Sequence, residues 1–209
     1  MNAAFNPKAK PSKLAHIVLR TSPGRWEKML EFYKLLLGAK VVMEAPIIAF
    51  LTYDEEHHRI AIAKFPFMLP QLKLFRGVDH VAFTFSSLND LLATYERMKD
   101  GGFTPVWCVH HGGTVSIYYE DLDGNLVETQ VDAFETMEAT NEFIDSEDFQ
   151  TNPIGVDFDP DDWIRRLKAG EPEEQVSRRV SEGPRHPSTI PRPIQGTVPW
   201  LLSKLAPAA

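Results

Sequence analysis

The chain has 209 residues, of which 43% are hydrophobic, and a formal net charge of −7. This size fits one ordinary domain or two small fused modules, and the acidic balance offers nucleic acid no evident binding surface. The sequence shows neither a signal-peptide pattern at its start nor the roughly 20 consecutive apolar residues of a membrane span. Because the single cysteine, Cys108, has no internal disulfide partner, we expect a cytoplasmic protein.

The first part of the body, about residues 12–70, is predicted to form a strand, a helix and three further strands. The opening strand, LAHIVLRT, carries His16. An amphipathic helix follows and ends at Gly38. Its apolar face comprises Trp26, Met29, Leu30, Tyr33, Leu36 and Leu37. The three later strands are predicted at KVVMEA, IIAFLTY and RIAIAKF.

The second part, about residues 76–132, repeats this order. The opening strand, VDHVAFTF, carries His80, and a helix is predicted after Ser87, which can cap it. Gly101 and Gly102 end that helix. Strands are then predicted at PVWCVH, TVSIYY and LVETQV. The β-α-β-β-β order therefore occurs twice, which predicts an α+β fold with an internal repeat.

The ends of the chain differ from the body. Residues 1–11 form an N-terminal extension, and residues 133–209 form a C-terminal arm that is rich in proline beyond residue 153. We expect this arm to be extended and partly ordered by packing on the body or on a partner subunit, and we expect a homo-oligomer. It contains one helix signal, at residues 161–169, with Asp159 as cap, Pro160 at the first helical position and Gly170 as stop.

Three side chains in the body are candidate metal ligands. His16 and His80 stand at equivalent places in the two repeats, 64 residues apart, and Glu128 lies on the last predicted strand. Two imidazoles and one carboxylate form the facial triad that binds non-haem Fe(II). A single strand histidine is more often a hydrogen-bonded core residue, but its repetition in the same register favours a metal site formed by His16, His80 and Glu128.

The body, residues 12–132, resembles the vicinal-oxygen-chelate superfamily, which includes glyoxalase I, fosfomycin-resistance proteins and type I extradiol dioxygenases. The segments that carry this resemblance are LAHIVLRT, EFYKLLLGAKVV, GVDHVAFTF and DLDGNLVE. The resemblance implies two tandem βαβββ modules that form a curled mixed sheet around a metal cleft.

The segment EHHRIAIA, residues 56–63, is similar to small extradiol dioxygenases. This resemblance gives His58 the role of a proton shuttle above the metal and makes His57 a neighbour or a substrate contact. It also places Tyr118 and either His110 or His111 against the substrate, with the choice between the two histidines left open. The implied reaction is Fe(II)-dependent cleavage of a catechol-type diol by dioxygen, with Mn(II) as a possible metal.

The fourth ligand position of glyoxalase I falls near Ala61 when the repeats are overlaid, and alanine has no donor atom. Three protein ligands leave about three positions of an octahedral ion for a diol and dioxygen, which favours oxygen chemistry over isomerisation. Phe50, Trp107 and Ile117 are candidate apolar walls. The alternatives are a metal-dependent transferase like the fosfomycin-resistance proteins and a non-catalytic small-molecule-binding protein. The identity of the diol stays open.

Overall fold

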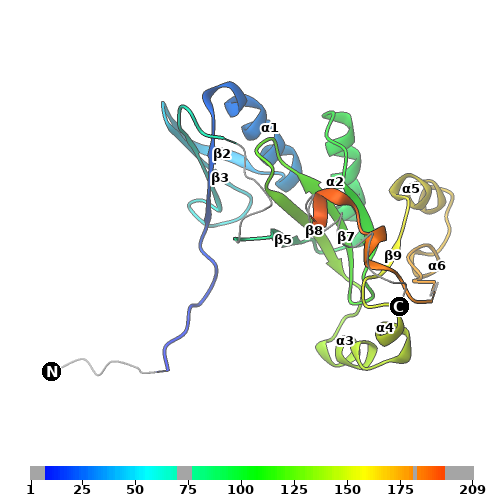
Figure 1. Cartoon of the computed structure of the whole chain (residues 1–209). Coiled ribbons are helices and arrows are strands. Elements are labelled where there is room, and N and C mark those ends of the chain that lie inside the picture. Colours follow the sequence, from blue (N-terminus) through cyan, green and yellow to red (C-terminus); the bar gives the residue numbers. More distant parts are fainter. Residues whose placement is uncertain (1–7, 70–76, 181–182, 196–209) are drawn as a thin grey trace. The chain divides into compact units, whose positions relative to one another are not determined.

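The computed structural model describes residues 8–69, 77–180 and 183–195. The chain divides into two compact units, Met1–Met68 and Leu69–Ala209, and each is described by itself. This division falls close to the end of the first predicted repeat. Figure 1 shows the elements of both units.

The first unit contains the predicted strand, helix and three strands. The helix α1 (Trp26–Leu37) buries the predicted apolar face, with Phe32 in addition and Leu37 half-buried, and Gly38 ends it at a φ of +60°. The strands pair in the order β1-β4-β3-β2, with β1 parallel to β4 and the other pairs antiparallel. Their bounds are Ile17–Thr21 for β1, Lys40–Ala45 for β2, Ile48–Thr52 for β3 and Ile60–Lys64 for β4, and a short 3-10 helix, η1, spans Pro23–Arg25.

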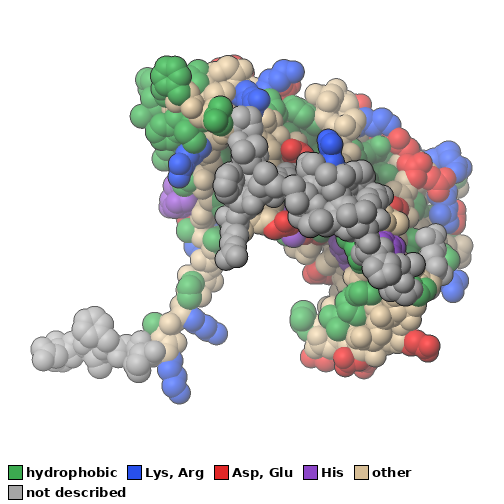
Figure 2. Space-filling view, in the orientation of Figure 1, with side chains coloured by type: hydrophobic (Ala, Val, Ile, Leu, Met, Phe, Trp, Pro, Cys, Tyr) green, Lys and Arg blue, Asp and Glu red, His purple; other side chains and the backbone are tan. Residues whose placement is uncertain are grey.

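Part of the first unit's surface is apolar. Figure 2 shows hydrophobic side chains gathered over the β2–β3 end of this unit. Val42 and Met43 on β2 and Ile47 in the turn to β3 are 45%, 36% and 64% exposed. Val18 on β1 is 55% exposed as well, because α1 covers only one face of this sheet.

The second unit repeats the plan and adds one strand. Its sheet has the order β5-β8-β7-β6-β9, with β5 parallel to β8 and all other pairs antiparallel. Ser87 caps α2 by accepting a hydrogen bond from the backbone N–H of Asp90, as the sequence predicted. The bounds are His80–Thr84 for β5, Leu88–Asp100 for α2, Trp107–His110 for β6, Thr114–Glu120 for β7, Leu126–Asp132 for β8 and Val156–Asp157 for β9.

The C-terminal arm holds more structure than the sequence predicted. The helix expected at residues 161–169 is α5 (Pro160–Lys168), and Asp159 caps it through the N–H of Asp161. The helices α3 (Met137–Ile144) and α4 (Glu147–Thr151) and the strand β9 were not predicted. Thr136 and Ser146 cap α3 and α4. Neither helix has a buried side chain, so neither shows the strong apolar periodicity from which a helix is predicted. The remaining elements are α6 (Glu173–Val176), η2 (Pro187–Thr189) and α7 (Arg192–Gln195).

No helix among the described residues has both the length and the apolar character needed to cross a membrane.

Candidate metal and catalytic site

Glu128 occupies a central place in the second sheet. Its strand, β8, lies between β5 and β7, and Glu128 pairs with Ala82 on one side and Tyr118 on the other. Side chains of directly paired residues share a face of the sheet, and so do residues two apart on one strand. Glu128, Tyr118 and His80 therefore all lie on the same face, and only 5% of Glu128 is exposed.

The turn before β8 fixes where this strand begins. Asp121 is 4% exposed, and its carboxylate accepts hydrogen bonds from the backbone N–H groups of Asp123 and Asn125 and from the Asn125 side chain. Gly124 sits at a φ of +89°, a conformation that glycine adopts without strain. The DLDGN segment is thus a closed turn that sets the register of Glu128.

His80 and Glu128 have the arrangement of two ligands of one ion. Nε2 of His80 lies 3.1 Å from Oε2 of Glu128, and Nδ1 of His80 lies 2.7 Å from the carboxylate of Asp79. Two donors at right angles, each about 2.1 Å from a divalent ion, are about 3 Å apart. A carboxylate on the far nitrogen is the usual orienting partner of a metal-binding imidazole. These residues fit a metal, although the described residues assemble no complete group of three His, Cys, Asp or Glu ligands.

Tyr118 and His111 stand beside this pair. The Tyr118 hydroxyl is 3.1 Å from Nε2 of His111, and Tyr118 pairs directly with Glu128 across β7 and β8. Nδ1 of His111 lies 2.6 Å from the backbone carbonyl of Ile154. A carbonyl only accepts hydrogen bonds, so Nδ1 carries a proton and Nε2 is the nitrogen that faces Tyr118. Burial lowers the pKa of His111, and burial together with the charge of Glu128 raises the pKa of Tyr118.

His110 lies on the opposite face of the sheet. It pairs with Val115, which alternates with Tyr118 along β7, so the His110 side chain points away from Tyr118 and Glu128. Its Nδ1 accepts a hydrogen bond from the N–H of Gly112, and the side chain lines a cavity of about 1000 Å³ together with Phe143 and Arg179. The structure therefore does not bring His110 to the candidate site, and the choice that the sequence left open narrows to His111.

The burial of His110 predicts a pH dependence of stability. Burial lowers its pKa to about 4, with contributions from the charges of Arg179 and His111. Because this folded-state pKa lies below the unfolded value of about 6.5, its stabilising contribution is complete above about pH 6.5 and is lost as the pH falls toward 4. We expect a loss of about 2 kcal/mol in the free energy of unfolding between about pH 7.5 and pH 5 from this group.

Urea unfolding of the metal-free chain at both pH values measures this loss. His110→Asn keeps an acceptor for the N–H of Gly112 but does not titrate, so its pH dependence should be shallower than that of the parent chain by this amount. An equal pH dependence for the two proteins would show that folding does not lower the pKa of His110.

His16 and His58 lie together in the first unit. His16 directly precedes β1, and its ring centroid is 4.4 Å from that of His58. His58 also stacks on Phe50 at 4.3 Å and is 9% exposed. Nδ1 of His58 is 2.5 Å from Nδ1 of His57, whose side chain is 68% exposed, so Nε2 is the His58 nitrogen left for other partners. Burial and the neighbouring charges of His16 and His57 lower the pKa of His58.

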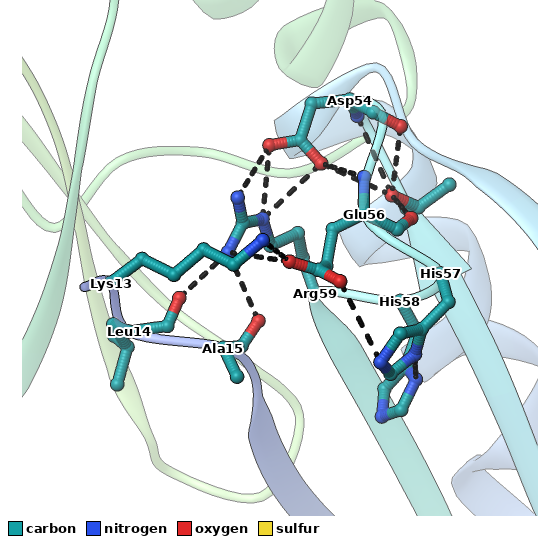
Figure 3. A network of polar contacts seen from close by, with 9 residues as sticks. Lys13, Leu14, Ala15, Asp54, Glu56, His57, His58 and Arg59 are labelled. Carbon is teal, nitrogen blue, oxygen red and sulfur yellow. Dashed lines mark hydrogen bonds and ion pairs between the residues drawn. The ribbon is translucent and has the colours of Figure 1, made fainter. Parts of the chain in front are cut away.

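A polar network ties the turn that carries His57 and His58 to the residues before β1 (Figure 3). Arg59 donates to the backbone carbonyls of Leu14 and Ala15, at 2.6 and 3.1 Å, and forms an ion pair with Asp54 at 2.9 Å. Glu56 pairs with Lys13. The turn that carries His57 and His58 is therefore tied to the residues just before His16.

The two repeats match at the position of the missing fourth ligand. In the second unit Glu128 pairs with Ala82, two residues after His80. In the first unit Ala61 pairs with Val18, two residues after His16. Ala61 is thus the counterpart of Glu128, as the overlay of the repeats predicted, and it supplies no side-chain ligand.

Some parts of the site were missed or misplaced from sequence. Asp79 and Arg59 were not singled out, although each directly adjoins a candidate histidine. Trp107 lies on the Tyr118 face, since the two residues pair directly. Ile117 pairs with Thr129 and faces the other side, so it is not a wall of this site.

Comparison with known proteins places the chain in a family. Residues 13–129 match the model of the glyoxalase/bleomycin resistance protein/dioxygenase superfamily. This match covers more than half of the chain, and the tandem βαβββ units agree with it. The chain belongs to this superfamily.

Two relatives are similar over most of the chain. Biphenyl-2,3-diol 1,2-dioxygenase 2 of Rhodococcus globerulus is 42% identical over 166 residues, which are 79% of this chain and 86% of the relative. Biphenyl-2,3-diol 1,2-dioxygenase 3 of the same organism is 42% identical over 173 residues, 80% of this chain and 88% of the relative. The crystal structure of a glyoxalase/dioxygenase from Nostoc punctiforme shares the fold, with 18% identity, a TM-score of 0.50, and coverage of 64% of this chain and 99% of that one.

Proposed function

We propose that this protein is a ring-cleaving extradiol dioxygenase that acts on a catechol-type aromatic diol. The observation that carries the proposal is the cluster of His80, Glu128, Tyr118 and His111 on one sheet face, in a chain 42% identical to two biphenyl-2,3-diol 1,2-dioxygenases. The cluster offers both metal donors and hydrogen-bonding groups for a diol. Both atoms of dioxygen enter the product, so the reaction needs no external reductant.

The proposed metal ligands are His16, His80 and Glu128, and the proposed metal is Fe(II), with Mn(II) as the alternative. The pairing of His80 with Glu128 and the support from Asp79 favour this assignment. The convergence of His16 with the pair is part of the proposal. It rests on the equivalent positions of the two histidines in the repeats and on the family resemblance. A bound divalent iron would supply acidification of the two substrate hydroxyls and electron transfer to dioxygen.

The chain's own residues then orient the substrate and move its protons. The Tyr118 hydroxyl is placed to hydrogen-bond a diol oxygen next to Glu128, and Nε2 of His111 holds that hydroxyl in position. His58 can accept a hydroxyl proton at Nε2, the ring nitrogen that does not face His57, and return it later in the reaction, because an imidazole titrates near neutral pH. The burial of His58 against Phe50 keeps bulk water from competing for that proton.

The test is a spectroscopic assay of the whole chain loaded with Fe(II) without oxygen. Addition of oxygen and a catechol should give a yellow ring-fission product. Parallel loading with Mn(II) identifies the active metal. Absence of ring fission with catechol and with biphenyl-2,3-diol, under both metals, would reject the proposed function.

A further inference from the structure

Trp107 is a buried aromatic residue beside the candidate site, paired with Tyr118 across the two strands. It is 8% exposed, and its ring stacks on that of Tyr118 with centroids 5.5 Å apart and planes 27° from parallel. The rings of His111 and Trp107 are nearly perpendicular, with centroids 5.4 Å apart. A ring whose oxygens reach Tyr118 therefore has Trp107 next to it on the β6 side.

The C-terminal arm packs on this surface. Ile190 and Ile194 are both partly buried against the cluster formed by Trp107, Val109 and Tyr118. The family match ends at residue 129, so these two isoleucines come from a part of the chain outside the superfamily domain. Both side chains remain partly exposed.

A charged clamp holds the arm there. The Arg185 guanidinium forms two parallel hydrogen bonds with the Asp157 carboxylate, at 2.7 and 2.9 Å, and Asp157 also accepts a bond from the Trp107 indole at 2.7 Å. Arg185 lies over the Trp107 ring at 5.5 Å and donates to the Thr189 hydroxyl at 2.8 Å. Its side chain is only 12% exposed, and a paired, mostly buried guanidinium of this kind fixes geometry in a way that a surface ion pair does not.

We propose that Ile190 and Ile194, held by the Arg185–Asp157 clamp, form with Trp107 the wall that selects diols bearing an apolar substituent. This inference rests on the proposed function, because it takes the diol oxygens to lie at Tyr118 and Glu128. A bare catechol ends near Tyr118 and makes little use of the wall. A second aromatic ring on the β6 side would pack against the partly exposed isoleucines, which Trp107 supports.

The expected effect is selective. Contacts in an apolar pocket change discrimination by about 10- to 200-fold for each methylene-sized difference. Ile194→Ala removes three carbons from the wall and leaves the candidate ligands and Tyr118 in place. We therefore expect kcat/KM for biphenyl-2,3-diol to fall by at least about tenfold, while that for catechol changes by less than about threefold.

The experiment measures two quantities on the full chain: kcat/KM in air, and the dissociation constant without oxygen, from tryptophan fluorescence. Both quantities are measured for catechol and for biphenyl-2,3-diol, on the parent chain and on the variants Ile194→Ala and Arg185→Gln. Both variants should lose the preference for the larger diol in both measurements. Ile144→Ala, at an isoleucine of α3 that is 39% exposed, is the matched control and should keep the preference.

The outcomes separate the wall from the reaction. Equal losses for both diols in a folded Ile194→Ala protein would overturn the wall, even if the parent chain cleaves both. A parent chain that cleaves neither diol but binds the larger one more tightly, with that preference lost in Ile194→Ala, would reject the proposed function and support the wall. If Ile194→Ala does not fold, Ile194→Val gives a smaller selective loss, and its absence overturns the inference.

Discussion

Replacement of His80 by alanine is expected to abolish stoichiometric iron binding and ring cleavage together. The imidazole supplies one of three proposed protein donors, and its loss leaves only two. Because Glu128 is 5% exposed, its carboxylate would then lack both the metal and the His80 ring that it faces in the structure. Metal analysis of the protein after anaerobic loading and desalting is the measurement. Near-stoichiometric iron in His80→Ala would contradict the ligand assignment.

Two further variants grade this expectation. Glu128→Gln keeps the size but removes the charge that offsets the divalent ion, and it should retain iron much more weakly. Asp79→Asn leaves all three proposed ligands in place and removes only the orienting carboxylate, so metal affinity should fall by about 10- to 100-fold. Glu138→Gln, in the exposed first turn of α3, is the matched control and should bind iron normally.

An unchanged Glu128→Gln protein would move the carboxylate ligand elsewhere. Asp121 is a poor replacement, because its carboxylate already accepts three hydrogen bonds in the turn before β8. Glu120, at the end of β7, would be the first residue to test instead.

The repeat was predictable from local sequence. Apolar residues at helical spacing identified α1 and α2. Gly38 marked the C-terminal end of α1, and Ser87 marked the N-terminus of α2. Tyr118, placed at the substrate by the family resemblance, pairs directly with Glu128 across β7 and β8. These features depend on patterns within short segments, and such patterns can be recognised in one sequence.

Local sequence could not predict which of the two histidines, His110 or His111, faces the candidate site. His110 and His111 are adjacent, so one of them must face away, but the strand ends at His110 and the Gly112 that follows has a φ of +106°. The choice is made by contacts distant in sequence. Ile154, 43 residues away, accepts the proton of His111, and β9 adds its backbone to β6. A strand of two residues such as β9 is too short to show a periodic pattern in the sequence.

The arm was underestimated for the same reason. Its proline content suggested an extended segment, yet Arg185 and Asp157, 28 residues apart, fasten it to Trp107. An ion pair between two isolated polar residues leaves no pattern in the sequence. The proposed effect on substrate choice rests on the packing of Ile190 and Ile194 against the cluster that contains Tyr118.

His58→Gln is expected to separate oxygen chemistry from metal binding. The proposed role of His58 is proton transfer, outside the set of metal ligands, so iron and catechol binding should stay nearly intact. Turnover should fall by about 100- to 10,000-fold, the usual loss for a positioned acid or base. Glutamine is preferred to a bulky apolar residue, because a bulky side chain beside Phe50 could also block substrate binding.

The neighbouring histidine supplies the matched control. The His57 side chain is 68% exposed, whereas His58 is 9% exposed and packs between His16 and Phe50. His57→Gln should therefore reduce turnover much less than His58→Gln. The measurements are catechol binding without oxygen and the rate of ring fission after oxygen is added. If His58→Gln loses its iron, His58 is itself a ligand and the alignment of the two repeats around His16 is wrong. If it cleaves at the parent rate, the buried contacts of His58 serve only to fold the turn, and the proton shuttle must be sought at another residue.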